Sequence, residues 1–350
     1  METVVFDCEQ LRKPYTGFHS YCNSLAGALV QDRPQNTRLS LYAPPSRTGA
    51  FGSDVQYLPW RSSHKFFLPA PKDIGLWHCT SQFSKYRPSS RRIPLLLTLH
   101  DVNFAHMQES AFKSRHHHNL YRQAICRARR IVTISESSKR DILEHFDIGD
   151  RRIDVVYNGI EPCPPQVQEP AVPPRRPFLL NINRVCRNKN IHVLPALLSG
   201  NDFDLLIAGP LEDPAYAREI LEEARKWQVQ DRVQFIGPVA DREKHWYLQH
   251  CSAFLFPSLA EGFGLPVLEA LQYYRPVFCS DRTSLPEVGG DCVFYLNHDF
   301  DPRAMQEDLE QGLQAFSKGI LSREMIDRHL ARFSWRSAAR AYWKIYQEML

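Results

Sequence analysis

Short apolar segments alternate with amphipathic, helix-forming segments along most of the chain, and this alternation restricts the folds that the chain can adopt. Apolar segments separated by helices are typical of parallel strands covered by helices on both faces. In the first half, the expected strands are Val4–Cys8, Arg38–Ala43, Val55–Trp60, Ile74–Thr80, Leu95–His100, Arg130–Ser135 and Ile153–Tyr157. In the second half, they are Phe178–Asn183, Asp204–Ala208, Val233–Gly237, Ala253–Pro257, Pro276–Ser280 and Cys292–Leu296. The sequence therefore predicts an α/β fold with doubly wound parallel sheets.

A proline-rich segment interrupts the alternation once, at residues 161–177, which contain seven prolines. Such a segment cannot be a helix or a central strand, so we expect a fairly stiff linker. It would join a first domain at residues 1–160 to a second at 178–334, and an amphipathic helix at 335–350 would cross back to the first. Ligands of doubly wound sheets bind beyond the carboxyl ends of the strands.

The apolar runs, the start of the chain and the cysteines together indicate the cellular compartment of the protein. No apolar run approaches the roughly 18 residues that a membrane-spanning helix needs. The start of the chain, Met1–Asp7, lacks the basic residues of a signal peptide. Nine dispersed cysteines without a C-x-x-C pair indicate reduced core thiols rather than disulfides or a zinc site. These features predict a cytoplasmic protein.

The stretch Phe256–Gln272 combines a buried strand end, a loop that contains Gly264, and a helix whose first turn holds Pro266. Glycine lets the backbone approach a ligand closely, and backbone N–H groups at a helix start favour an anion or a hydroxyl-rich ligand. Glu261 in the loop and Glu269 in the helix could both face that ligand. An ordinary helix start with a solvated glutamate has the same pattern, so the stretch alone leaves both interpretations open.

Together with other segments of the chain, this stretch resembles the signature of glycosyltransferase family 4. Members of that family are retaining sugar-nucleotide transferases with two facing Rossmann-like domains, the GT-B architecture. Glu261 and Glu269, with seven residues between them, match the family's signature. The segment Asn183–Asn190 resembles its basic phosphate loop, with Arg184 and Lys189 five residues apart. The other matching segments are Gly17, Leu99–Asp101, Ile134–Lys139, Asn158–Gly159, Phe235–Gly237, Arg275–Ser280 and Ser284–Asp291. The resemblance covers nearly the whole chain.

The resemblance implies a nucleotide-sugar donor, whose diphosphate gains negative charge as the glycosidic bond breaks. Arg184 and Lys189 would supply the compensating positive charge, although solvated loop cations are the alternative. Backbone N–H groups near Thr283 and Ser284 would also hold phosphate. No Asp-x-Asp pair stands out as a metal clamp, so neither a metal nor a cofactor is expected.

The resemblance also assigns residues to the donor. Glu269 would accept hydrogen bonds from the ribose hydroxyls, because a carboxylate offers two acceptor oxygens. Glu261, with the N–H groups of Phe263 and Gly264, would hold the sugar hydroxyls. The other expected donor contacts are Gly17, Gly237, Leu265, Thr283 and Ser284. The expected catalytic residues are His100, Arg184, Lys189 and Glu261.

In the first domain, His100 ends an apolar strand and would contact the donor sugar, with a core histidine bonded to the backbone as the alternative. Asp101 would orient His100 or bind the acceptor, and Ser135 is a further expected acceptor contact. Gly17 would let the backbone approach the diphosphate. The chain departs from the family's pattern here, because His19 stands where a small residue is common.

The implied reaction transfers a sugar, with retention at its anomeric carbon, to a hydroxyl of a glycan or lipid-linked acceptor. The context would be bacterial-type polysaccharide, lipopolysaccharide or glycolipid synthesis. Ser284–Asp291 looks like the matching segment of bacterial mannosyltransferases and favours GDP-mannose, with a UDP-sugar as the alternative. Epimerases and phosphorylases of this architecture lack this glutamate spacing or need other signatures, such as a phosphorylase's cofactor lysine region, which the sequence does not show. A non-catalytic nucleotide-sugar-binding partner subunit is a weaker alternative, because the glutamates, the basic loop and His100 are all present.

The first half of the chain is basic, with 22 Lys and Arg against 14 Asp and Glu in residues 1–155. The cations are concentrated in Arg87–Arg92, in Lys113–Arg130, and in Arg61–Lys72 with Phe66 and Phe67. We hypothesise peripheral contact with an anionic membrane. A solvated basic surface with the aromatic side chains packed underneath is the alternative, and no nucleic-acid partner is expected.

Overall fold

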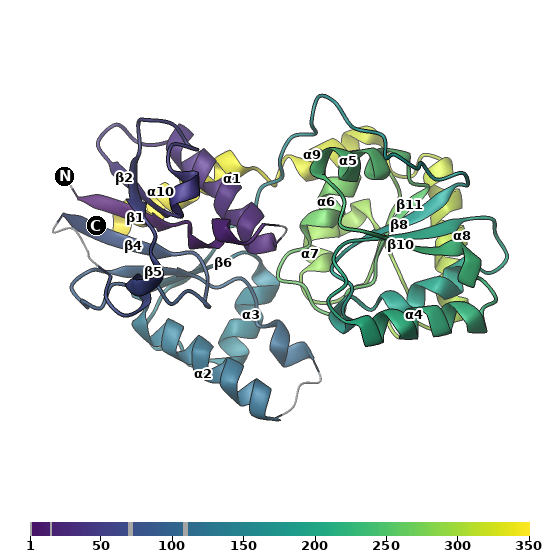
Figure 1. Cartoon of the computed structure of the whole chain (residues 1–350), viewed down its shortest axis with the longest axis horizontal. Helices are drawn as coiled ribbons and strands as arrows, with labels where there is room; N and C mark the ends of the chain where they lie inside the picture. The colour runs from purple at the N-terminus through teal and green to yellow at the C-terminus, as the bar shows by residue number, and fades with distance from the viewer. Residues whose placement is uncertain (1, 15, 69–72, 108–110) are drawn as a thin grey trace. The chain divides into compact units, whose positions relative to one another are not determined.

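The computed structural model describes residues 2–14, 16–68, 73–107 and 111–350. The chain forms two compact units, one of Met1–Glu161 with Phe333–Leu350 and one of Pro162–Arg332. Each unit contains one parallel sheet with helices on both faces (Figure 1). The predicted α/β class with doubly wound sheets is confirmed.

The first sheet has the strand order β3-β2-β1-β4-β5-β6-β7. Its strands are β1 (Thr3–Asp7), β2 (Arg38–Ala43), β3 (Gln56–Pro59), β4 (Ile74–Cys79), β5 (Leu95–Thr98), β6 (Arg130–Thr133) and β7 (Ile153–Val155). All seven expected strands are present, but several end earlier than expected. β5 pairs with β6 only as far as Thr98, whereas the apolar pattern continues to Leu99. Burial therefore continues past Thr98, and the N–H of Leu99 still donates to the carbonyl of Val132 over 2.9 Å.

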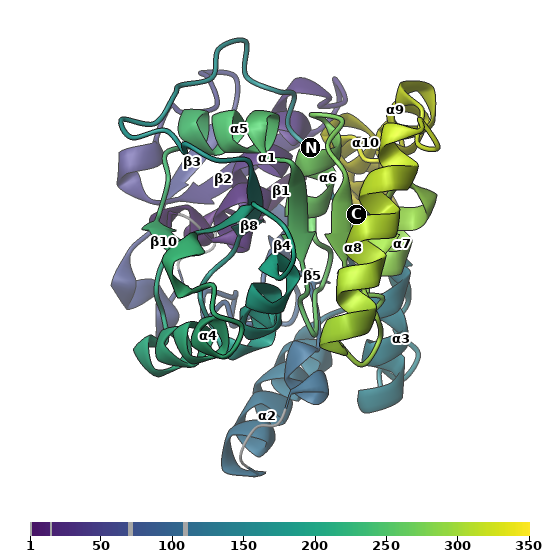
Figure 2. The same ribbon diagram turned by 90° about the vertical axis from the view of Figure 1, so that its right-hand side faces the viewer.

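The helices of the first unit cover both faces of this sheet. They are α1 (Gly17–Gln31), α2 (Ala111–Arg127), α3 (Glu136–His145) and α10 (Trp335–Met349), with the short 3-10 helices η1 (Glu9–Arg12), η2 (Pro45–Arg47), η3 (Ser62–Lys65) and η4 (Asn103–His106). α2 and α3 lie side by side (Figures 1 and 2), where the rings of Tyr121 and Phe146 stack with centroids 5.7 Å apart.

The C-terminal helix α10 packs on α1 within the first unit (Figure 1). The buried Tyr342 hydroxyl lies 2.7 Å from that of Tyr21. The Tyr346 hydroxyl lies 2.7 Å from Nδ1 of His78 on β4. Burial lowers the pKa of His78 to about 3, so this imidazole is neutral, with one ring nitrogen as a donor and the other as an acceptor. Polar contacts inside the core thus bond α10 to the sheet and to α1.

The second sheet has the order β10-β9-β8-β11-β12-β13. Its strands are β8 (Phe178–Ile182), β9 (Asp204–Ala208), β10 (Val233–Gly237), β11 (Ala253–Phe256), β12 (Val277–Cys279) and β13 (Phe294–Tyr295). Its helices are α4 (Pro214–Lys226), α5 (Asp241–His250), α6 (Leu265–Leu271), α7 (Leu285–Gly289), α8 (Pro302–Ser317), α9 (Arg323–Leu330), η5 (Arg187–Lys189), η6 (Ile191–Leu198), η7 (Gln230–Arg232) and η8 (Gly290–Cys292).

One core of the second unit lies between the sheet and a layer of η6, α4 and α8, of which Figure 2 labels α4 and α8. Fully buried Leu179, Leu205 and Leu255 of neighbouring strands belong to this core. Helices α5 and α6 lie on the other side of the sheet from α4 (Figure 1). Because both faces are covered, the strands can be apolar throughout, as their sequences require.

Chain order reverses once in each sheet, between β1 and β4 in the first and between β8 and β11 in the second. At such a switch point the loops after the two strands run apart and leave room for a ligand. In the second unit these loops are residues 183–190 and 257–264.

Other sequence expectations can be compared directly with the structure. Residues 161–177 contain no helix or strand, and Pro162 onward is grouped with the second unit. All nine cysteines are free, and six of them are buried, as expected for reduced core thiols. Within the described ranges, no helix is long and apolar enough to cross a membrane.

Candidate functional site

The two loops at the switch point of the second sheet are bonded to each other. The backbone N–H of Leu259 donates to the carbonyl of Asn188 over 2.9 Å. The Asn188 side-chain amide donates to the carbonyl of Ala260 over 3.0 Å. Segments about 70 residues apart in sequence therefore form one continuous surface, and the strand order is what brings them together.

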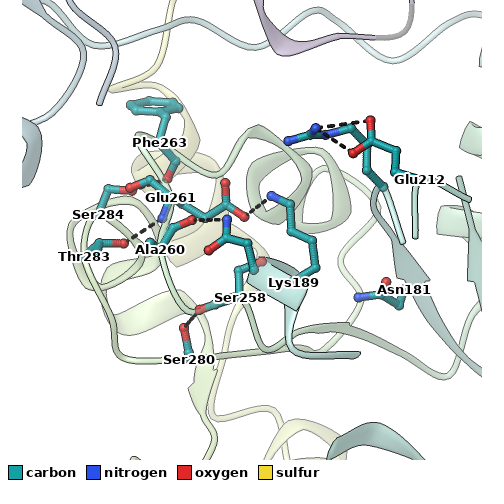
Figure 3. A network of polar contacts seen from close by, with 12 residues as sticks. Asn181, Lys189, Glu212, Ser258, Ala260, Glu261, Phe263, Ser280, Thr283 and Ser284 are labelled. Atoms are coloured by element: carbon teal, nitrogen blue, oxygen red, sulfur yellow. Dashed lines mark hydrogen bonds and ion pairs between the residues drawn. The ribbon is translucent and has the colours of Figure 1, made fainter. Parts of the chain in front are cut away.

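Lys189 and Glu261 form an ion pair on this surface. Nζ of Lys189 lies 2.5 Å from Oε1 of Glu261 (Figure 3), and the two side chains are only 10% and 13% exposed. The ammonium also lies 5.7 Å from the centre of the Phe256 ring. Water screens such a pair weakly, so the attraction holds both side chains in place. The structure thus brings together two of the residues predicted to be catalytic.

Thr283 and Ser284 hold the backbone of the Glu261 loop. The N–H of Glu261 donates to the Thr283 hydroxyl over 2.9 Å. The Ser284 hydroxyl lies 2.9 Å from the carbonyl oxygens of Glu261 and of Phe263, to which it donates (Figure 3). The side chains of these two predicted donor contacts therefore bond to the loop itself. Their contact with a donor stays a prediction.

The glycine requirement differs among the three predicted glycines. Gly264 has φ +108°, and a Cβ there would lie 2.6 Å from Cδ2 of Leu285, so a side chain is strained and crowded. Gly237 has φ +71°, but its Cβ would meet open space. Gly17 begins α1, where the Thr16 hydroxyl accepts from the N–H of His19, and its Cβ would also meet open space.

The remaining predicted residues of this loop, Phe263 and Leu265, differ in burial. Phe263 is buried, with 4% of its surface exposed, and its carbonyl accepts from Ser284. Leu265 is half-buried at the first position of α6.

Arg184 lies in the same basic loop but has a partner of its own. Its Nη1 lies 2.9 Å from Oε2 of Glu212, and half of its side chain remains exposed. Burial alone would lower the pKa of this guanidinium, but the carboxylate of Glu212 and, more weakly, that of Glu261 raise the pKa above its usual value. Arg184 is therefore a charged, partly accessible group near the Lys189–Glu261 pair.

Glu269 also pairs with a lysine. Nζ of Lys244, on α5, lies 3.0 Å from Oε1 of Glu269 and 3.2 Å from Asp241. Burial alone would lower the pKa of Lys244, but these two carboxylates outweigh it and raise the pKa. The side chain of Glu269 remains 27% exposed, which leaves it accessible to a ligand hydroxyl.

His100 belongs to the first unit, just after β5, and it is buried. Its Nε2 lies 2.8 Å from the carbonyl of Thr80, so Nε2 carries the proton and donates. Burial lowers the pKa of His100 to about 4, which keeps the imidazole neutral. The rings of Phe18 and Tyr21 pack on it, with centroids 4.7 and 4.6 Å away. These are the features of a core histidine bonded to the backbone, the alternative interpretation of this residue.

The other predicted residues of the first unit take part in local structure. A carboxylate oxygen of Asp101 accepts from the N–H of Asn103 over 3.1 Å. Ser135 caps α3, where its hydroxyl accepts from the N–H of Ser138. His19 is partly buried, and burial together with the nearby charge of Arg47 lowers its pKa.

Several residues that shape the site were not predicted. Glu212 and Lys244 pair with predicted residues from other elements, and no local pattern marks them. Gly209 has φ +135°, and a Cβ there would lie 1.9 Å from the carbonyl oxygen of Asn183. Its signal was present in the sequence as a Gly-Pro pair directly after an apolar strand.

Comparisons with known proteins identify the family. Residues 164–318 match the family described as Glycosyl transferases group 1, and residues 30–163 match Glycosyltransferase Family 4. The O-antigen chain mannosyltransferase RfbU of Salmonella typhimurium is 25% identical over 235 residues, which are 65% of this chain and 65% of that protein. The O-antigen chain mannosyltransferase B of Escherichia coli is 26% identical over 257 residues, which are 69% of this chain and 66% of that protein. The matches therefore span just under two thirds of each relative.

Solved structures show the same fold. A glycosyltransferase from Rickettsia africae has a TM-score of 0.72 at 15% identity, with 99% of this chain and 98% of that chain covered. Anabaena Alr3699/HepE, in complex with UDP and glucose, has a TM-score of 0.66 at 16% identity, with 99% and 100% covered. The two parallel sheets agree with these matches, and, with the family models that match residues 30–318, the chain belongs to glycosyltransferase family 4.

Proposed function

We propose that this glycosyltransferase moves mannose, with retention, from GDP-mannose to a hydroxyl of a glycan or lipid-linked acceptor. The observation that carries this proposal is the Lys189–Glu261 ion pair at the switch point of the second sheet. The pair combines a cation suited to a phosphate with a carboxylate suited to sugar hydroxyls. Both side chains are held in position before a ligand arrives, which lowers the entropy cost of binding.

In this proposal, Arg184 and Lys189 neutralise the diphosphate as it leaves, and the reaction needs neither a metal nor a cofactor. The basic loop supports this, because it places two cations five residues apart after β8. Two Asp-x-Asp sequences could be considered as a metal clamp. In the first, Asp204 begins β9 at the amino edge of the sheet, and in the second, the Asp301 side chain caps α8. Turnover should be unchanged by EDTA, and its loss with EDTA and recovery with Mg²⁺ would contradict this part of the proposal.

Retention is supported by how the two glutamates are engaged. Lys189 holds Glu261 and Lys244 holds Glu269, so neither carboxylate is a free nucleophile or base. In the proposed step, the acceptor oxygen bonds to the anomeric carbon on the face from which the phosphate departs. The phosphate oxygen takes the acceptor's proton, and the electron pair of the broken bond stays on the diphosphate. NMR of the product from an α-linked donor should show an α linkage, and a β linkage would contradict retention.

The donor base and sugar are proposed from the relatives. Two relatives are named mannosyltransferases, which supports GDP-mannose. A UDP-sugar is the second candidate, since Alr3699/HepE was solved with UDP and glucose.

A thermal-shift panel with GDP, UDP and their sugars tests the donor directly. A ligand that binds only the folded state stabilises it by mass action, by about 2.7 kcal/mol at 100 times its Kd, and thereby raises the melting temperature. GDP and GDP-mannose should give the largest shifts. A larger shift with UDP-sugars would reassign the donor, and no shift with any nucleotide would contradict a nucleotide-sugar enzyme.

Peripheral contact with an anionic membrane remains part of the proposal, restricted to one surface. Arg61 and Lys65 accompany Phe66 and Phe67, whose residues are 84% and 73% exposed rather than packed underneath. Residues 69–72, including Lys72, lie outside the described residues. The basic segment Arg87–Arg92 leads into the amino end of β5, whereas the exposed phenylalanines follow the carboxyl end of β3. The two segments therefore lie at opposite edges of the parallel sheet, and the proposed contact includes only the segment with the phenylalanines.

Flotation on anionic vesicles should fall in the variant Phe66→Ser/Phe67→Ser, and flotation equal to wild type would refute this contact.

A further inference from the structure

Four arginines line a pocket at the amino edge of the first sheet. Arg91 and Arg92 precede β5, Arg127 is the last residue of α2, and Arg129 directly precedes β6. β5 and β6 are parallel neighbours, so their amino ends lie at the same edge. The pocket has a volume of about 280 Å³, and four of its seven lining residues are arginine while none is acidic.

The exposed arginines of this pocket have no counter-charge. Among the described residues, the guanidinium groups of Arg91, Arg92 and Arg129 form no ion pair or hydrogen bond, although the backbone N–H of Arg92 donates to the Ser90 hydroxyl. The next residue along the chain is different: Arg130 lies 2.6 Å from Asp154 and 2.7 Å from Glu348. The fold therefore supplies carboxylates to the arginine beside the pocket and none to the pocket. Like charges gathered in this way repel each other until an anion joins them.

Arg127 fixes the shape of the pocket. Its Nη2 donates to the carbonyls of Ser90 over 2.7 Å and of Pro88 over 3.1 Å. These bonds attach the loop that carries Arg91 to the end of α2. Burial is the main cause that lowers the pKa of Arg127, and the nearby positive charges of Arg91 and Arg87 lower the pKa further. The positively charged loop is thus held against the helix by its own carbonyls rather than by acidic side chains.

We propose that this pocket binds a phosphate group, through the guanidinium groups of Arg91, Arg92 and Arg129. Guanidinium presents a planar fork of N–H donors that matches two phosphate oxygens at once. The volume is slightly below that of typical small-molecule sites, which suits a phosphate or a phosphorylated head group better than a larger ligand. Ligands of doubly wound sheets bind at the carboxyl edge, so this site is separate from the one proposed for sugar transfer.

The test measures binding of inorganic phosphate to the full chain by calorimetry, at constant ionic strength because salt screens charges beyond about 8–10 Å. The pocket variant is Arg92→Ala/Arg129→Ala, which spares the carbonyl bonds of Arg127. Arg122→Ala is the matched control, since it removes an exposed charge from α2 outside the pocket. Lys189→Ala removes the cation of the other proposed phosphate site.

The pocket variant should weaken phosphate binding at least about tenfold, because each lost bond to a charged group contributes more than about 1.4 kcal/mol. Arg122→Ala should bind phosphate within about twofold of wild type. Equal affinity in wild type and the pocket variant, or an equal loss in Arg122→Ala, would overturn the proposal. Loss of all phosphate binding in Lys189→Ala alone would also overturn it, by assigning the phosphate to the other site.

Vesicles identify the source of the phosphate group. Phosphatidic acid vesicles that float the wild type, but not the pocket variant, would assign a lipid head group. Calorimetric binding without preference for phosphatidic acid over phosphatidylcholine vesicles would assign a free phosphate or phosphate ester. Sugar transfer to a soluble acceptor should be the same in wild type and the pocket variant, which separates this site from the proposed transferase site.

Discussion

Replacement of Lys189 by alanine is expected to lower kcat/KM by about 10²–10³-fold, the loss typical when one preorganised charge-stabilising group is removed. Lys189 is held at the switch point by its ion pair with Glu261 and by the Phe256 ring. In the proposed reaction, its ammonium is thereby positioned for the diphosphate oxygen that gains charge as the sugar leaves. Steady-state release of the nucleotide from its sugar donor, with acceptor present, measures the effect.

Stability must be separated from catalysis in this experiment. Lys189→Ala leaves the Glu261 carboxylate largely buried without its partner, which should cost roughly 1–3 kcal/mol of folding free energy. The double variant Lys189→Ala/Glu261→Gln removes the unpaired charge, so it should recover stability in urea unfolding but not activity. Lys226→Ala, at an exposed lysine paired with Glu223, should leave activity within about twofold. A loss below about threefold in Lys189→Ala would contradict the proposed role.

Gly209→Ala is expected to destabilise the protein by about 2–5 kcal/mol, through a backbone clash added to an unfavourable φ. A Cβ at this position would lie 1.9 Å from the carbonyl oxygen of Asn183 and 2.7 Å from its carbonyl carbon. The N–H of Gly209 donates to the carbonyl of Gly237 over 2.8 Å, so the glycine cannot move away without breaking that bond. The clash falls on the segment that leads into Arg184.

The matched control is Gly200→Ala. Gly200 also has a positive φ, +76°, but its Cβ would meet nothing within 4 Å. Gly200→Ala should therefore lower the free energy of unfolding only by the cost of the positive φ, about 1 kcal/mol. Urea unfolding of both variants isolates the steric part as the difference between them. Equal destabilisation of the two variants would show that the Asn183 contact is not tight.

The strands could be predicted from sequence because each is a short apolar run between helices, and this is a local property. The Lys189–Glu261 contact could not be predicted from spacing, because it joins residues 72 apart through the strand order. Glu212 and Lys244 were missed for the same reason: their contacts depend on which strands are neighbours. For His100, the apolar pattern predicted the last residue of a strand, but β5 ends at Thr98, and the bond of His100 to Thr80 depends on a neighbouring strand.

Hydrogen–deuterium exchange with and without GDP-mannose tests the central claim most directly, because it locates the bound donor without requiring an acceptor. The donor should slow exchange at residues 183–190 and 257–264, the two loops that meet beside Lys189 and Glu261. The double variant Lys189→Ala/Glu261→Gln should lose this protection at the same donor concentration. Donor binding that leaves exchange in both loops unchanged would contradict the assignment of this site.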